Sequence, residues 1–176
     1  GDSTNQGGFV PLLAQSLTNE TGLEFKAINY GVAGNTSSQI LTRMQEKKEI
    51  RKDLKQAQLL TITVGGNDLR KAILEDTSNL DLERFEKASK TYEKNLKQII
   101  ELARKDNPDL LIYVVGIYNP LYLNFPDLTE LQTLVDQWNQ RTEDTLSAYQ
   151  GVYFVPINDL LYKGIDGQSG VTESEL

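Results

Sequence analysis

The stretch of sequence that decides the fold reads Thr61-Ile62-Thr63-Val64-Gly65-Gly66-Asn67-Asp68. The segment from Leu59 to Val64 is apolar and β-branched, which predicts a buried strand. Two glycines end this strand, and a helical pattern follows from about Leu69. Ligands of open α/β sheets bind at the carboxyl ends of the strands, and the Asn67 amide would project there. Such an amide can donate a hydrogen bond to a developing oxyanion. An ordinary strand-to-helix turn with Asp68 as the N-cap fits the same residues.

A second stretch has the same order of strand, glycine turn and polar helix start. It reads Ala27-Ile28-Asn29-Tyr30-Gly31-Val32-Ala33-Gly34-Asn35-Thr36-Ser37. Here Gly34 would offer its backbone N–H at the same edge of the sheet, and Thr36 or Ser37 would cap the next helix. Together, N-x-G-x-x-G-x-T-S and G-G-N-D resemble two conserved blocks of the SGNH hydrolases, also called GDSL-type lipases and esterases.

This resemblance covers nearly the whole chain and is closest to the bacterial lipase/acylhydrolase-like branch. It implies a three-layer α/β/α fold with a flavodoxin-like parallel sheet. It implies a serine esterase or lipase-type acyl hydrolase that acts on a small-molecule, lipid or acylated-sugar ester, with an oxyanion hole formed by the Gly34 N–H and the Asn67 amide. It also implies a protein that is extracellular or anchored to the membrane at the bacterial cell surface.

Two other functions fit the residues. One is a catalytically inactive module of the same fold that binds carbohydrate or a protein partner. The other is an unrelated flavodoxin-like binding domain, although the loops contain neither G-x-G-x-x-G nor a P-loop lysine.

Length and composition indicate one globular domain over residues 1–176, with 39% hydrophobic and 24% charged residues. The net charge of −7 argues against a nucleic-acid or anionic-membrane partner, because neutralising phosphate requires a basic stripe. The sequence has no cysteine, which excludes disulfides and thiolate metal sites. We expect no metal and no cofactor. No apolar run approaches the roughly 18 residues that span a bilayer.

The sequence contains no histidine. A Ser–His–Asp hydrolase needs an imidazole to accept the proton of its nucleophile, and the resembling family takes it from a D-x-x-H motif near the C-terminus. Gly1-Asp2-Ser3 spells the family's first block, which makes Ser3 a candidate nucleophile. No apolar strand precedes it, however, and these residues fit a later Gly-Asp of close relatives better. We therefore expect the domain to be incomplete at both ends, with the nucleophile upstream and the catalytic Asp and His downstream.

The rest of the chain alternates helical and strand patterns. We expect strands at residues 23–30, 58–64, 110–118 and 152–155, and helices starting near residues 9, 36, 69, 82 and 128. This alternation predicts a parallel sheet with helices on both faces, from which the first strand is missing. The charged run 45–55 is expected to form a solvent-exposed helix surface.

Five residues are candidates for substrate binding. Asn35 and Asp68 follow the two glycine turns, whereas Tyr118, Asn119 and Tyr122 lie in an aromatic and apolar segment after the third expected strand. This segment would either pack beneath a long loop or form a wall of a pocket for an acyl group.

Overall fold

The computed structural model describes residues 8–74, 81–120 and 129–163. The chain forms two compact units, Gly1–Asn35 and Thr36–Leu176. In the first unit, helix α1 (Phe9–Thr21) ends at Gly22, which adopts a left-handed conformation, and residues 24–32 follow without helix or strand. The single domain expected over residues 1–176 stays a prediction.

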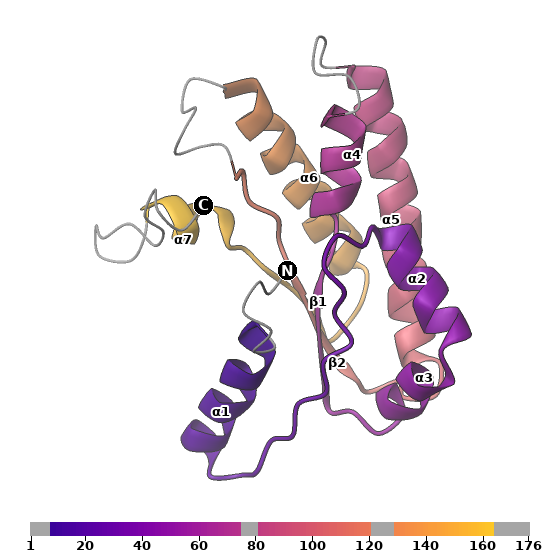
Figure 1. Ribbon diagram of the computed structural model, residues 1–176, viewed down its shortest axis with the longest axis vertical. Helices are drawn as coiled ribbons and strands as arrows, with labels where there is room; N and C mark the ends of the chain where they lie inside the picture. The colour runs from indigo at the N-terminus through magenta and orange to yellow at the C-terminus, as the bar shows by residue number, and fades with distance from the viewer. Residues whose placement is uncertain (1–7, 75–80, 121–128, 164–176) are drawn as a thin grey trace. The chain divides into compact units, whose positions relative to one another are not determined.

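The second unit is built on a three-stranded parallel sheet in the order β1-β2-β3. Its strands are β1 (Leu59–Thr63), β2 (Leu111–Val115) and β3 (Val152–Val155). Helices α4 (Gly66–Leu74) and α5 (Leu82–Arg104) connect β1 to β2, and α6 (Thr129–Ser147) connects β2 to β3. Right-handed crossovers between adjacent parallel strands place these helices on one face of the sheet. The predicted α/β fold with a parallel sheet is confirmed (Figure 1).

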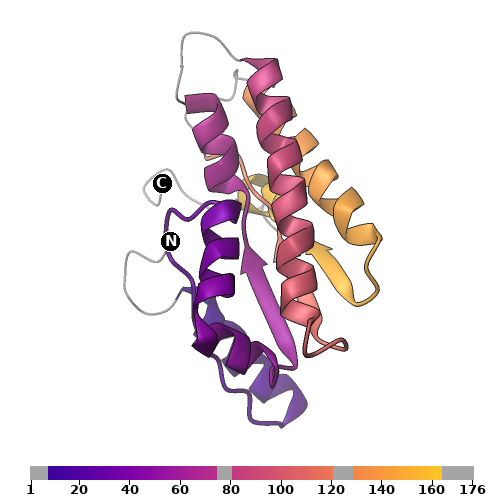
Figure 2. The same cartoon turned by 90° about the vertical axis from the view of Figure 1, so that its right-hand side faces the viewer.

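The core lies between this helical layer and the sheet. Every second residue of β2 is buried, as the period of a strand requires, whereas in β1 Ile62 is buried and Leu59, Leu60 and Thr61 are half-buried. Figure 2 shows β1 behind α5 and α2 (Ser37–Glu46). Helix α5 contributes one continuous stripe of side chains that are at most 8% exposed: Phe85, Ser89, Tyr92, Asn95, Leu96, Ile99, Ile100 and Ala103. From α6, Trp138 packs against Phe85 and Tyr92, with ring centroids 5.8 and 4.9 Å apart.

Two side chains fix the amino-terminal ends of the strands. Arg104, the last residue of α5, donates hydrogen bonds to the Leu110 and Gln150 carbonyls, which precede β2 and β3. Asn107 donates to the Leu54 and Ala57 carbonyls before β1. The loops at this end of the sheet are therefore tied to one another.

The strand predicted at residues 23–30 is wrong. Residues 24–32 form neither a helix nor a strand in the part of the chain that the structure describes. A strand is stable when a neighbouring strand satisfies its backbone groups, and a sequence pattern alone does not supply that neighbour. Consistent with this, Leu23 and Ile28 are 65% and 62% exposed.

Three helical segments differ from expectation. Helix α4 begins at Gly66 rather than Leu69, so Asp68 lies inside its first turn and is not its N-cap. The charged run 45–55 contains a separate helix, α3 (Lys48–Leu54), whose charged side chains are mostly exposed, as expected. The short helix α7 (Asn158–Lys163) was not predicted.

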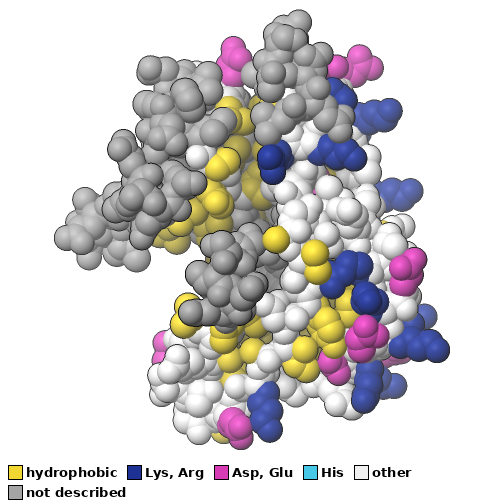
Figure 3. Space-filling model, viewed as in Figure 1, with side chains coloured by type: hydrophobic (Ala, Val, Ile, Leu, Met, Phe, Trp, Pro, Cys, Tyr) yellow, Lys and Arg dark blue, Asp and Glu magenta, His cyan; other side chains and the backbone are white. Residues whose placement is uncertain are grey.

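Basic side chains gather over α2, α3 and α5 (Figure 3). They do not form an uninterrupted stripe, because acidic residues lie among them. Lys97 pairs with Glu93 at 2.6 Å, and Lys47 pairs with Glu49 at 3.8 Å. This surface is therefore a mixed, solvated helix face.

Candidate active site

The turn after β1 is supported from below by two aromatic side chains. Gly65 has φ +105°, a conformation that residues with a Cβ rarely adopt. A Cβ built on it would lie 2.7 Å from Trp138 Nε1 and 3.0 Å from Tyr92 Cε2. Both rings are 1% exposed, so neither can move aside into solvent. A glycine at position 65 therefore allows the backbone of the turn to pack directly against the two buried rings.

Asn67 is the second residue of α4 and follows this turn immediately. Its side chain is half-buried. The backbone N–H groups in the first turn of a helix have no partner within the helix, and the positive end of the helix dipole lies there. The surroundings of Asn67 thus favour a negatively charged oxygen.

The carboxylate of Asp68 is hydrogen-bonded to Ser37 through both of its oxygens. Oδ2 accepts from the Ser37 backbone N–H at 2.8 Å, and Oδ1 accepts from Ser37 Oγ at 2.5 Å. Ser37 is the first residue of α2, so one carboxylate in the first turn of α4 also occupies the N-terminus of α2. This arrangement joins two helix starts that are 31 residues apart in the chain.

Ser37 has a further partner on α5. Asn95 donates from Nδ2 to Ser37 Oγ at 2.9 Å and to Ser38 Oγ at 2.8 Å. Ser37 is fully buried, and Asn95 is 8% exposed. Burial raises the pKa of Asp68 above its usual value of 3.8, and the two hydrogen bonds from Ser37 act in the opposite direction.

The second glycine turn belongs to the first unit. Gly34 has φ +81° and an open space where a Cβ would lie, so the backbone conformation alone demands glycine there. The Asn35 N–H donates to the Val32 carbonyl at 3.3 Å and closes the turn. Asn35 itself is half-buried. Thr36 then starts α2 through a capping box with Gln39, as the sequence predicted for Thr36 or Ser37.

The segment after β2 carries two other candidates. Tyr118 is 40% exposed, whereas Asn119 is 1% exposed. The Asn119 N–H donates to Asn158 Oδ1 at 3.2 Å, and its side-chain amide donates to Gln132 at 3.3 Å. Asn119 therefore joins the chain after β2 to α6 and α7, whereas Tyr118 is open to solvent.

Two candidates, Ser3 and Tyr122, lie outside the described residues. The same holds for residues 121–126 of the aromatic and apolar segment, which was expected either to pack beneath a long loop or to form a wall of a pocket for an acyl group. In the described ranges no group of three His, Cys, Asp or Glu side chains is arranged to hold a metal ion.

Sequence reasoning missed Ser37 and Asn95 as parts of this region. The available signal was the position of Asn95. It falls on the inward, otherwise mainly apolar stripe of α5, where a buried amide needs partners.

The fold is of the α/β class with a parallel sheet, and the chain belongs to the GDSL-like lipase/acylhydrolase family, whose model matches residues 1–172. It is 31% identical over 183 residues to the uncharacterized protein YpmR of Bacillus subtilis, covering 99% of this chain and 71% of that protein. It is 26% identical over 147 residues to the spore germination lipase LipC of Bacillus licheniformis, covering 81% and 67%. The crystal structure of the lipase Lip_vut3 from a goat rumen metagenome has a similar fold, with a TM-score of 0.79 and 22% identity over 99% of this chain and 85% of that one.

Proposed function

We propose that this protein hydrolyses carboxylic esters through an acyl-enzyme, with the Gly34 N–H and the Asn67 amide holding the oxyanion of the tetrahedral intermediate. The observation that carries the proposal is the placement of Asn67. It follows the carboxyl end of β1, on a turn that rests on Trp138 and Tyr92 and in a helix start that is bonded to Ser37. Membership of the acylhydrolase family supports the same chemistry.

Rigid donors suit this task because an oxyanion hole works by preorganisation. Donors that are already in place need no reorganisation when charge develops, and one such donor is typically worth about 2.7–4 kcal/mol of barrier. A backbone N–H at a glycine turn and an amide at a helix start are both donors of limited freedom. The pairing of Gly34 with Asn67 in one site is part of the proposal.

The mechanism also needs a serine nucleophile and an imidazole base. Ser3 is a candidate for the first, and the 176 residues contain no histidine for the second. The complete reading frame is therefore the first test. A D-x-x-H motif downstream, with a strand that ends in serine upstream, would support the hydrolase. A complete frame without any histidine would refute it in favour of the inactive binding module.

The decisive experiment is Asn67→Ala in the protein expressed from its complete reading frame, assayed on a p-nitrophenyl ester. We expect kcat to fall by about 10²–10³, as for loss of one oxyanion donor, with a much smaller change in KM. Asn19→Ala removes an exposed amide of α1 and serves as the matched control. An unchanged kcat in Asn67→Ala would refute the role of this residue.

The substrate class proposed is a lipid ester or an acylated sugar. Comparing p-nitrophenyl acetate, butyrate and decanoate with an acetylated sugar would distinguish the two. We further propose that the protein acts outside the cell or anchored at the cell surface, which fractionation of its source bacterium would test. Among the described residues, no helix is long and apolar enough to cross a membrane.

A further inference from the structure

We infer that Asp68, Ser37 and Asn95 form a positioning device for the Asn67 amide, an inference that rests on the proposed role of Asn67. None of the three is proposed to touch substrate. They fix the rotation of α4 about its axis and its position along that axis. This in turn sets the direction in which the Asn67 amide points.

The chemistry of the three groups allows one direction of hydrogen bonding around an ionised Asp68. An amide nitrogen only donates, so Ser37 Oγ must accept from Asn95 Nδ2 at 2.9 Å. The hydroxyl hydrogen of Ser37 is then left for Asp68 Oδ1 at 2.5 Å, while the Ser37 N–H bonds Oδ2 at 2.8 Å. Each member has a fixed role, and hydrogen bonds in such a chain strengthen one another.

The device connects three helices through Ser37. Asp68 lies in the first turn of α4, Ser37 begins α2, and Asn95 lies in the middle of α5. Asp68 is bonded through both oxygens, so α4 can neither rotate about its axis nor slide along it without breaking a charge-assisted bond. Asn67 precedes Asp68 directly and shares this constraint. A catalytic group must be held within about 0.5 Å of its productive position.

Packing alone does not explain these side chains. Ser37 is 0% exposed and Asn95 is 8% exposed, in a layer whose other members are mostly apolar. Burying a polar group costs free energy unless it is hydrogen-bonded, and an apolar residue at position 95 would fill the same space without that requirement. The three polar side chains instead fix the orientation of the helices relative to one another, because hydrogen bonds are directional.

Ser37 also lies close in the sequence to the other proposed donor. It follows Gly34 by three residues. The residue that anchors Asp68 is therefore also the first helical residue after Gly34.

Ser37→Ala and Ser38→Ala make a matched pair of variants. Each removes one hydroxyl acceptor of Asn95, but only Ser37 contacts Asp68. In the full-length protein we expect Ser37→Ala to lower kcat about 10-fold, less than the roughly 100-fold that a 1 Å misplacement can cost, with KM within about twofold. Ser38→Ala should keep both constants. Thermal unfolding of each variant shows whether it is folded at the assay temperature.

A double-mutant cycle with Asn67→Ala separates positioning from a general loss of structure. If the device acts through Asn67, Ser37→Ala will have little further effect on kcat once the amide is absent. Independent, multiplying effects, or a Ser37→Ala enzyme with normal kcat, would overturn the inference while leaving the proposed function intact. An Asn67→Ala enzyme with normal kcat would instead overturn the proposed oxyanion role of Asn67, on which the inference rests. Should Ser37→Ala not fold, Asp68→Asn, which keeps the shape but replaces one acceptor with a donor, takes its place in the same cycle.

Discussion

Replacing Gly65 by alanine tests whether the turn after β1 really rests on the aromatic core. The added methyl would lie 2.7 Å from Trp138 Nε1 and 3.0 Å from a Tyr92 ring carbon, well inside van der Waals contact. Placing a residue with a Cβ in the left-handed region costs roughly 1–2 kcal/mol, and overpacking a core costs about 1–3 kcal/mol. We therefore expect Gly65→Ala to lower the free energy of unfolding by about 2–5 kcal/mol.

Urea unfolding measures this loss directly. Trp138 is the one tryptophan of the 176 residues and lies beneath the turn, so its fluorescence reports the transition locally. With a urea dependence of about 2 kcal/mol per molar, the midpoint should fall by about 1–2.5 M. Gly66→Ala is the control, because its Cβ would lie 3.7 Å from Ile117, an ordinary contact. If Gly65→Ala and Gly66→Ala unfold at the same urea concentration, the support assigned to the two rings is refuted.

Three further predictions concern stability. Burial raises the pKa of Asp68 above 3.8, so the folded protein binds the proton of this carboxyl more tightly than the unfolded chain does. The free energy of unfolding of the wild type, minus that of Asp68→Asn, should therefore fall as pH rises from about 4 through the folded-state pKa. A difference that does not change with pH would contradict this cause. Asn139→Leu removes two 2.8 Å hydrogen bonds to the backbone of the buried Ile117 and should lower the free energy of unfolding, measured in urea, by about 1–3 kcal/mol. An unchanged midpoint would show that these two hydrogen bonds do not stabilise the segment after β2. Arg104→Met keeps the aliphatic stem but leaves the Leu110 carbonyl without its donor, which should lower the melting temperature, whereas Lys105→Met, at an exposed neighbouring position, should not.

The sequence was sufficient for elements whose pattern is local and repeated. Helix α5 shows an apolar stripe with helical spacing over its whole length, and β3 was predicted with its observed bounds. The short helix α7 follows β3 with too few residues to show a period. The strand expected at residues 23–30 had the right composition, but a ladder depends on a neighbour, which composition does not reveal.

The parts of the candidate site that depend on local sequence were predictable, and the parts that depend on distant residues were not. The two glycine turns and the position of Asn67 after β1 follow from local sequence, and positive φ at Gly34 and Gly65 agrees with those turns. The hydrogen-bond partner of Asp68 could not be predicted from the local sequence. Ser37 is 31 residues away in the chain, and Asp68 was assigned an N-cap or a ligand-binding role because its own neighbourhood allowed both.

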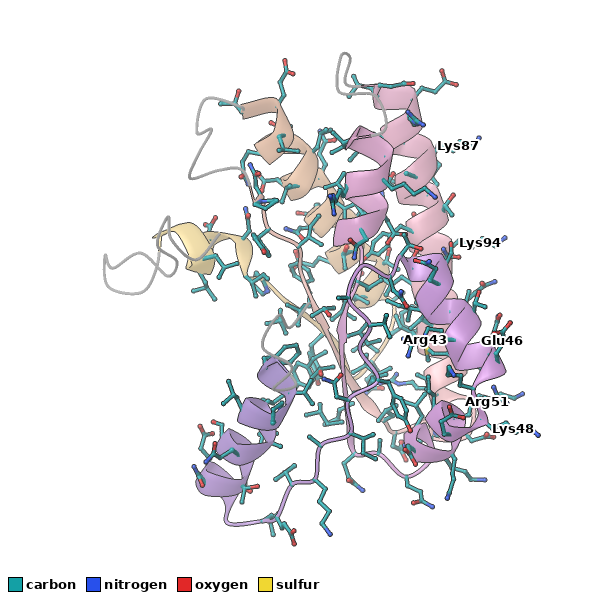
Figure 4. All side chains as sticks on the ribbon, viewed as in Figure 1. Arg43, Glu46, Lys48, Arg51, Lys87 and Lys94 are labelled. Carbon is teal, nitrogen blue, oxygen red and sulfur yellow. The ribbon has the colours of Figure 1, made fainter. Side chains whose placement is uncertain are left out.

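Helix α5 has an inward side whose residues are constrained by their contacts and an outward side whose residues are exposed to solvent. Its inward side carries Tyr92 beneath Gly65 and, one turn later, Asn95 beside Ser37. Its outward side carries Lys87 and Lys94, which point away from the neighbouring helices in Figure 4. Over evolutionary time the outward residues can exchange charge with little consequence, whereas an inward exchange would disturb the packing against Gly65 and the hydrogen bond to Ser37. Descendants of this protein can therefore adapt their surface to new salt or acidity while inheriting the same buried framework.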